Sequence, residues 1–257
     1  MAAHNKDETL RKFIASSLDA LITTAKFIED RYLLIDAEID AHISPSLQEV
    51  REYPYFTSYT DKDGQEVEFF YHSRLDEEKL VFYAITDKSV QSKFIIKFTR
   101  RYSPEAHCFL ACREWAPRLH HCSPLPGGWI AISMDVSHYT PLYGMRLSDN
   151  EKAKVKLKVR KVVEELHAGG FVHGDVRDTN ILIDRRSLGD TDDVKIHLID
   201  FDWAGPIGIT NYPMGVNRVT IKRPNGAQDW KPITPEHDNE MVSNLFLSNN
   251  LLAAKCL

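Results

Sequence analysis

Residues 171–183, FVHGDVRDTNILI, are the most informative stretch of this sequence. They contain the pattern H-x-D-x-x-x-x-N, which is made by His173, Asp175 and Asn180. A second acidic motif, LIDFDW at residues 198–203, follows another short apolar run. Oxygen donors on loops between short strands suit Mg²⁺ and phosphate, so Asn180 and Asp200 are candidate metal ligands. Asp175 is a candidate acceptor for the proton of an attacking hydroxyl.

The sequence around this stretch predicts a mainly helical half with a β-hairpin. Residues 148–168 are the clearest helix, because Ser148 and Glu151 form a capping box and a Gly-Gly pair ends it. The expected buried stripe of this helix consists of Val155, Val159, Val162, Val163 and Leu166. Two short strands are expected at residues 181–183 and 194–199, joined by a polar loop that we expect to be solvated.

The preceding sequence predicts a small antiparallel sheet with one helix. Strands are expected at residues 66–71, 79–86, 93–99 and 129–134, the second and third forming a hairpin. Ser103-Pro104-Glu105 opens a helix that should run to about Trp115. Ahead of the sheet, apolar residues at near-helical spacing over residues 6–42 predict a further helix that serves as a packing arm.

These elements together predict an α+β, two-lobed architecture. The expected divisions are a helical extension at residues 1–48, a lobe with the sheet at 49–135 and a short, mainly helical lobe at 136–257.

The composition excludes several functional classes. The 257 residues carry 32 Lys and Arg against 37 Asp and Glu, a formal net charge of −5, so no nucleic-acid partner is expected. No apolar run approaches the roughly 18 residues of a membrane-spanning helix, so no membrane association is expected. Four cysteines are too few for a disulfide framework, which favours an intracellular location, in the cytoplasm or the nucleus.

In this setting the motifs resemble those of the protein-kinase-like superfamily, and specifically of the fungal-type protein-kinase-like domain. KFTRRYSPEAH, a Gly-Gly-Trp strand, HGDVRDTN, IDFDWAG, a Tyr-Pro pair and EHD occur in that order between residues 93 and 238. The HGD and DFD variants are shared with the aminoglycoside and choline kinases. The resemblance covers about residues 49–245 and implies a two-lobed kinase-like fold with a truncated C-lobe, which uses ATP and Mg²⁺.

The resemblance implies a role for each polar residue of the catalytic loop. Asp175 matches the catalytic base, and Asn180 and Asp200 match the Mg²⁺ ligands. Arg177 stands where protein kinases have a lysine that steadies the γ-phosphate, and an arginine keeps the charge with a different geometry. His173 matches the structural histidine of the loop and is not expected to act chemically.

A second group of site residues is implied to lie on the sheet and its helix. Lys97 in FIIKF matches the strand lysine that holds the α- and β-phosphates, although the strand pattern alone is also compatible with an outward-facing lysine. Its acidic partner should lie on the following helix. Glu105 is favoured because the family's E-A-H places it there, and Glu114 is the alternative because its distance from Lys97 is nearer that of ordinary protein kinases.

The adenine is implied to bind between the two lobes. Met134, Asp135 and Val136 match the hinge, whose backbone would meet the base. Ile95 would lie above the base and Leu182 beneath it, since a flat purine requires apolar faces on both sides. Each of these apolar residues is equally compatible with an ordinary core position.

Several features depart from an ordinary kinase. The stretch 72–79, HSRLDEEK, which should cover the phosphates, has no glycine and carries three acids. Ile95 is larger than the usual alanine, and Asp202 replaces the glycine of D-F-G. Asp238 is placed to brace the catalytic loop from the next helix, or to act as a simple helix-cap acid. The sequence ends soon after it, without the last helices of a full kinase lobe.

Three functions remain open at this point. The first is a kinase that transfers the γ-phosphoryl group of ATP to a hydroxyl, most readily on a protein serine or threonine. The second is a catalytically silent binding module, which the glycine-free covering stretch and the short C-lobe favour. The third is a kinase of small molecules, which the HGD and DFD variants favour. A protein substrate is the expected partner, and a small hydroxyl acceptor is the alternative.

Overall fold

The computed structural model describes residues 14, 17–18, 21–26, 28, 56–61, 64–76, 79–86, 92–189 and 193–247. The chain divides into two units, Met1–Glu52 and Tyr53–Leu257. In the first unit the described residues are helical and expose their large apolar side chains. Most of the helix predicted over residues 6–42 lies outside the described residues. Among the described residues, no helix is long and apolar enough to cross a membrane.

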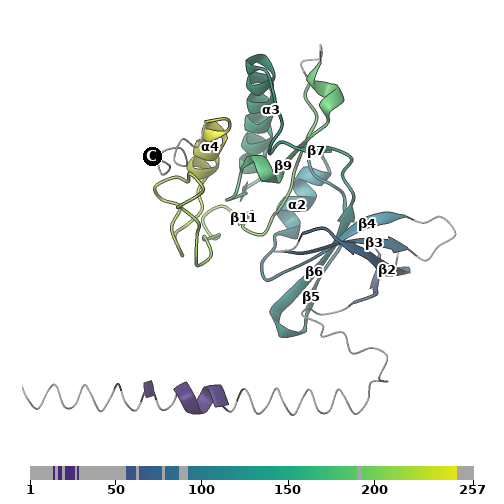
Figure 1. The fold of residues 1–257 in the computed structure, drawn as a ribbon, viewed down its shortest axis with the longest axis vertical. Coiled ribbons are helices and arrows are strands. Elements are labelled where there is room, and N and C mark those ends of the chain that lie inside the picture. Colours follow the sequence, from purple (N-terminus) through teal and green to yellow (C-terminus); the bar gives the residue numbers. More distant parts are fainter. Residues whose placement is uncertain are drawn as a thin grey trace, which may run out of the picture. The chain divides into compact units, whose positions relative to one another are not determined.

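The second unit contains a six-stranded antiparallel sheet with the strand order β1-β2-β3-β4-β6-β5 (Figure 1). Its strands are β1 (Ser58–Thr60), β2 (Glu66–Arg74), β3 (Leu80–Thr86), β4 (Lys93–Thr99), β5 (Leu119–Leu125) and β6 (Trp129–Asp135). The four predicted strands correspond to β2, β3, β4 and β6. β5 lies where no strand is predicted, because its sequence, LHHCSPL, lacks an alternating apolar pattern.

The alternation of side chains along β4 divides the sheet into two faces. Phe94, Ile96 and Phe98 are buried in an aromatic core together with residues of β1, β2 and β3. Because successive residues of a strand point to opposite faces, Ile95 and Lys97 lie on the other face of the sheet. That face is the one expected to receive the nucleotide.

The helix after β4 is shorter than predicted. α2 (Pro104–Ala111) begins at Ser103, whose hydroxyl accepts a hydrogen bond from the Ala106 amide at 3.3 Å. It ends at Ala111, and the chain turns at Glu114 with a positive φ of 60° instead of continuing to Trp115. Glu114 therefore lies beyond the helix on which it was expected.

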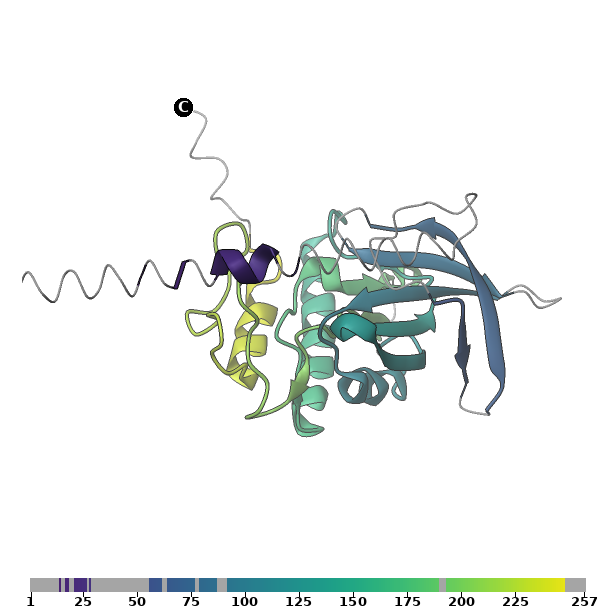
Figure 2. The same cartoon turned by 90° about the horizontal axis from the view of Figure 1, so that it is seen from below.

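In the rest of the unit, two α-helices are the longest regular elements. α3 (Asp149–Ala168) has the predicted capping box and the predicted buried stripe, and it lies beside α4 (Pro235–Asn244) (Figure 2). Two small antiparallel sheets complete it: β7 (Thr140–Pro141), β9 (Ile181–Ile183) and β10 (Ile196–Leu198), and β8 (Phe171–Val172) with β11 (Gly205–Pro206). The loop predicted to be solvated includes a short 3₁₀ helix, Arg185–Leu188, with Ser187 and Leu188 buried.

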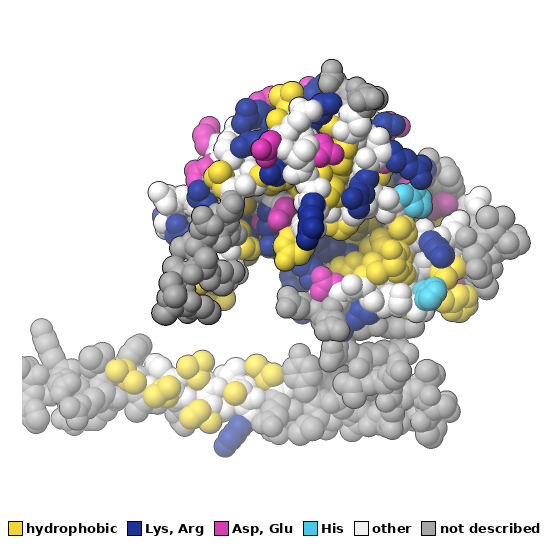
Figure 3. Space-filling view, turned by 45° about the horizontal axis from the view of Figure 1, so that its top comes forward, with side chains coloured by type: hydrophobic (Ala, Val, Ile, Leu, Met, Phe, Trp, Pro, Cys, Tyr) yellow, Lys and Arg dark blue, Asp and Glu magenta, His cyan; other side chains and the backbone are white. Residues whose placement is uncertain are grey.

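The hydrophobic clusters of the described residues agree with the α+β, two-lobed fold. One lies under the six-stranded sheet, and a second surrounds α3 and includes Ala106 and Leu110 of α2. A small third cluster contains Val172, Tyr212, Ala227 and Ile233. The expected boundaries at residues 48 and 135 stay predictions. On the face of this unit seen in Figure 3, Lys and Arg side chains are mixed with Asp and Glu side chains.

Candidate active site

The catalytic-loop segment between β8 and β9 is fixed by a buried carboxylate on α4. Asp238 is fully buried and accepts hydrogen bonds from the His173 amide at 2.7 Å and the Gly174 amide at 2.8 Å. Gly174 has a φ of +80°, and a Cβ there would lie 2.7 Å from Ile233 Cδ1, so the turn requires glycine. The structure therefore gives Asp238 the bracing role and not that of a simple helix cap.

His173 has the structural role that was expected for it. Its side chain is buried, and its Nδ1 accepts a hydrogen bond from the Asp175 amide at 3.2 Å. Nε2 must then carry the proton, and it donates to the Ile199 carbonyl at 3.1 Å. The imidazole thus joins the catalytic loop to the strand that leads to Asp200.

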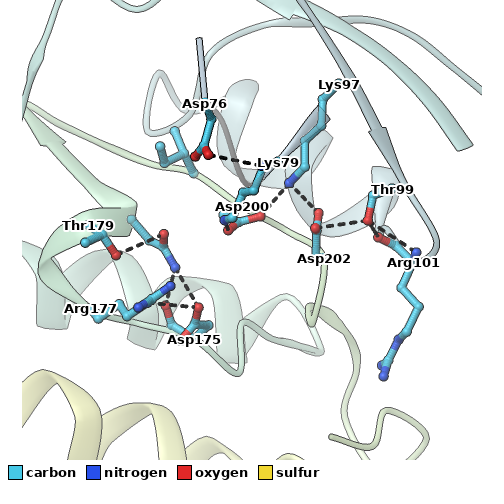
Figure 4. Close-up of polar contacts among 12 residues, drawn as sticks. Asp76, Lys79, Lys97, Thr99, Arg101, Asp175, Arg177, Thr179, Asp200 and Asp202 are labelled. Carbon is cyan, nitrogen blue, oxygen red and sulfur yellow. Dashed lines mark hydrogen bonds and ion pairs between the residues drawn. The ribbon is translucent and has the colours of Figure 1, made fainter. Parts of the chain in front are cut away.

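Asp175 lies at the centre of a dense polar cluster (Figure 4). Arg177 Nε donates to its Oδ2 at 3.1 Å, and Arg223 Nη2 donates to its Oδ1 at 2.8 Å. Asn180 Nδ2 donates both to Oδ2 and to the Asp175 carbonyl, each at 2.9 Å. Because the amide nitrogen of Asn180 faces Asp175, its Oδ1 is left with one long contact, 3.4 Å from the Thr179 hydroxyl.

Lys97 on β4 lies with its ammonium group between two carboxylates. Its Nζ is 2.5 Å from Asp200 Oδ1 and 2.5 Å from Asp202 Oδ1, and only 7% of the residue is exposed. Thr99, also on β4, donates its hydroxyl to the other oxygen of Asp202 at 3.0 Å. Lys97 is therefore a cleft lysine, not the outward-facing lysine that the strand pattern alone allowed.

These charges shift the titration of all three groups. Burial alone would lower the pKa of Lys97, but the Asp200 and Asp202 carboxylates outweigh it and hold its pKa above the usual value. Burial would raise the pKa of Asp200, yet Lys97 and Lys79 hold its pKa far below the usual value. For Asp202, burial prevails over Lys97, and its pKa is raised.

The expected ion pair between Lys97 and Glu105 is not formed. Glu105 lies in the first turn of α2, is exposed, and has its Oε2 3.3 Å from the Ser103 hydroxyl. Glu114 is exposed beyond the end of the helix. Asp202 instead supplies the second carboxylate to Lys97, because the residue after Phe201 is an acid and not a glycine.

The residues predicted to hold adenine lie around the open face of the sheet. Ile95 is paired with Met134 across β4 and β6, and both are half-buried. Leu182 is half-buried between two core residues of β9. A cavity of about 470 Å³ lies against this sheet face, and its lining includes Tyr83, Ile85, Lys93 and Val136. Asp135 ends β6 immediately before Val136. Their contact with a base stays a prediction.

The donors present in the cleft fit a magnesium ion that shares phosphate ligands. Asn180 Oδ1 and the Asp200 carboxylate are oxygen donors, and Asp200 has a positive φ of 70°. Among the described residues, no group of three or more His, Cys, Asp or Glu side chains could hold a metal by itself. Mg²⁺ commonly binds through one or two carboxylates together with substrate phosphates, which is the arrangement that these two residues could support.

Besides Asp202 and Thr99, three further contributors to the site were not predicted. Lys79 reaches Asp200 Oδ2 at 2.6 Å, and Arg223 reaches Asp175. The His107 ring of α2 stacks on Phe201 with 4.6 Å between centroids, which joins the helix to the acidic motif. Lys79 and His107 lie inside the segments that were recognised, but nothing in the sequence around Arg223 gave a signal, because its partner is 48 residues away.

No family model matches the chain. It is 32% identical over 76 residues to serine/threonine-protein kinase 1 of African swine fever virus, isolate Pig/Kenya/KEN-50/1950, which is 30% of this chain and 23% of that protein. The same protein of isolate Tick/Malawi/Lil 20-1/1983 is 33% identical over 76 residues, with the same shares. The chain thus matches less than a quarter of the length of these relatives.

Two solved structures with a similar fold are kinases. The Cydia pomonella granulovirus kinase PK-1 matches with a TM-score of 0.54 and 18% identity, over 68% of this chain and 65% of that one. Vaccinia related kinase 3 matches with a TM-score of 0.51 and 13% identity, over 75% of this chain and 67% of that one. The narrower resemblance to fungal-type domains stays a prediction. The described part of the chain has a protein-kinase-like fold.

Proposed function

We propose that this protein is a phosphotransferase that moves the γ-phosphoryl group of Mg-ATP to a hydroxyl, in the first place that of a protein serine or threonine. The observation that carries the proposal is that one site of a kinase-like fold contains both the Lys97–Asp200 pair and the Asp175–Asn180 pair. The Ile199 amide, next to Asp200, donates to the Asn180 carbonyl, and Figure 4 shows the two pairs near each other. The serine/threonine kinase names of the viral relatives support the choice of a protein acceptor.

Each residue of the site has one task in this proposal. Asp175 accepts the proton of the acceptor hydroxyl while the hydroxyl oxygen bonds to the γ-phosphorus and the bond to the β-phosphate oxygen breaks. Lys97 holds the inner phosphates, and Arg177 steadies the group in transfer. Asn180 and Asp200 would hold Mg²⁺, which neutralises phosphate charge. His173 and Asp238 keep the loop in place.

The proposal is tested by phosphate transfer from γ-³²P-ATP to serine- and threonine-containing proteins. Asp175→Ala should lower kcat by about 10²- to 10⁴-fold, the usual contribution of a general base. Asp178→Ala is the matched control, since this half-buried acid lies in the same loop. Among the described residues, the bond that its carboxylate accepts is from the Thr179 amide, at 2.9 Å. Equal transfer by wild type and Asp175→Ala would contradict the assignment of the base.

A silent binding module is the second candidate, and the contacts of Asp175 favour it. Both oxygens of this carboxylate already accept hydrogen bonds, from Arg223 on one side and from Arg177 and Asn180 on the other. These three bonds use most of the acceptor capacity of the carboxylate, so a substrate hydroxyl would have to share Oδ1 with Arg223. A folded protein that shows no Mg-ATP-dependent thermal shift and no phosphate transfer would establish this candidate.

A kinase of small molecules is distinguished by the acceptor. The HGD and DFD motifs at residues 173–175 and 200–202 are its only support. Transfer to aminoglycosides or choline, with none to proteins, would replace the protein acceptor and leave the roles of Lys97 and Asp175 unchanged.

A further inference from the structure

The stretch at residues 72–79 has no glycine, and its lysine points into the site (Figure 4). Lys79 Nζ lies 2.6 Å from Asp200 Oδ2, while Lys97 Nζ lies 2.5 Å from Oδ1 of the same carboxylate. We propose that Lys79 is a second phosphate-binding lysine, which holds the outer phosphates in place of the backbone amides of a glycine-rich loop. This inference rests on the proposed function, since it concerns the same nucleotide.

The backbone of Lys79 is restrained by Asp76. Asp76 Oδ1 accepts a hydrogen bond from the Lys79 amide at 3.0 Å, and the Asp76 carbonyl accepts one from Arg74 Nε at 2.8 Å. A backbone that is restrained in advance lowers the entropy lost when its lysine binds a phosphate.

The charges around Asp200 indicate that Lys79, and not Lys97, is the lysine whose side chain can move. Asp200 and Asp202 carry two negative charges, which Lys97 and Lys79 balance. The Lys97 side chain is 8% exposed and bonded to both acids, whereas the Lys79 side chain is 45% exposed and bonded through Nζ to Asp200. Once Asp200 binds a metal ion, two lysine partners are no longer needed to balance its charge. Lys79 is then the lysine that can turn toward a phosphate.

The alternative is that Lys79 forms only a surface ion pair. The chain offers a matched pair for this case: Lys152 and Asp149 at the start of α3 lie 2.9 Å apart, and the Lys152 side chain is 39% exposed. Exposed ion pairs of this kind contribute little to the free energy of unfolding. Only a phosphate-binding lysine should affect nucleotides in proportion to their phosphates.

The test is a calorimetric titration of the full chain with Mg-ATP, Mg-ADP and adenosine. Lys79→Gln should weaken Mg-ATP binding by roughly tenfold, as expected for the loss of one charge-assisted hydrogen bond to phosphate. It should weaken Mg-ADP less and leave adenosine binding within about twofold of wild type. Lys79→Arg should keep most of the Mg-ATP affinity, and Lys152→Gln should keep all of it.

The outcomes separate this inference from the proposed function. If Lys79→Gln binds Mg-ATP as wild type does, the inference fails and the proposed function stands. If Lys79→Gln loses adenosine binding as much as ATP binding, Lys79 acts on the cleft as a whole and the inference also fails. If the folded wild type binds adenosine but gains nothing from phosphates, or binds no nucleotide, both proposals fail.

Discussion

The two halves of the cleft are held together in different ways. The polar contacts of Asp175 within the catalytic loop join residues two to five positions apart, as in the bonds from Arg177 and Asn180. The contacts of Lys97 and Lys79 with the acidic motif join residues 103 to 121 positions apart. Local sequence can therefore specify these contacts of Asp175, although Arg223 and Asp238 reach the loop from 48 to 65 positions away. The contacts of the two lysines depend on how the lobes pack.

The largest expected change in the free energy of unfolding is at Asp238, the buried acid that bonds the loop between β8 and β9. Asp238→Ala removes the acceptor of two backbone amides and leaves these donors buried without a partner. We expect the free energy of unfolding, measured by urea denaturation, to fall by about 3–5 kcal/mol.

Asp229→Ala is the control for this variant. Asp229 also accepts from two backbone amides, at 2.8 and 3.0 Å, but it is exposed, and water can replace it. A similar loss of stability in both variants would mean that burial beneath the loop has no special importance.

The second effect concerns the contact that joins α2 to the acidic motif. His107 is buried against Phe201, and burial lowers the pKa of His107 to about 4. The unfolded chain takes up this proton near pH 6.5 while the folded chain does not, so stability should fall as the pH falls from 6.5 to 4. This residue should contribute about 3 kcal/mol of that loss.

Urea denaturation at several pH values measures this contribution. His107→Gln should be less stable at pH 7, but its free energy of unfolding should depend less on pH. An identical pH dependence of the two proteins would show that His107 does not titrate in this way.

A smaller change in stability is expected where Lys97 pairs with Asp200 and Asp202. Asp202→Asn weakens one of the two bonds of a buried ammonium, so we expect a loss of about 1–2 kcal/mol in the free energy of unfolding. Glu105→Gln is the matched control, because Glu105 is exposed and makes no bond to Lys97. If Glu105→Gln were the more destabilising variant, the helix glutamate would be the true partner of Lys97.

The smallest effect is expected at a feature that is entirely local. Ser148→Ala removes the hydroxyl that caps α3, where Ser148 Oγ accepts from the Glu151 amide at 3.3 Å. We expect a loss of about 1 kcal/mol, the usual contribution of a helix N-cap. Ser148→Asp should restore most of it in the same urea measurement, and a failure to do so would leave the capping role unsupported.

The sequence predicted what is local and periodic. The capping box of α3, the strands of FIIKF and WIAISM, and the compact pattern from His173 to Asn180 each carry their signal within a few residues. Asp200 is recognisable because its motif follows an apolar strand. These features can be predicted without knowing how the two lobes pack.

The remainder of the site could not be read from sequence, for physical reasons. The partner of Lys97 depends on where α2 begins, and Ser103-Pro104 places Glu105 in an exposed first turn. The contacts of Lys79 and Arg223 depend on chain segments brought together only by folding. A lysine in an acidic turn and an arginine in a long loop look like ordinary surface residues.

The central claim is that one cleft binds Mg-ATP through the acidic motif. A calorimetric titration of Mg-ATP into wild type and Asp200→Asn tests it most directly. We expect saturable binding by wild type that requires Mg²⁺, and binding by Asp200→Asn weakened by at least about tenfold, since the variant loses a charged metal ligand. Equal affinity in the two proteins, or no binding by a folded wild type, would contradict the claim.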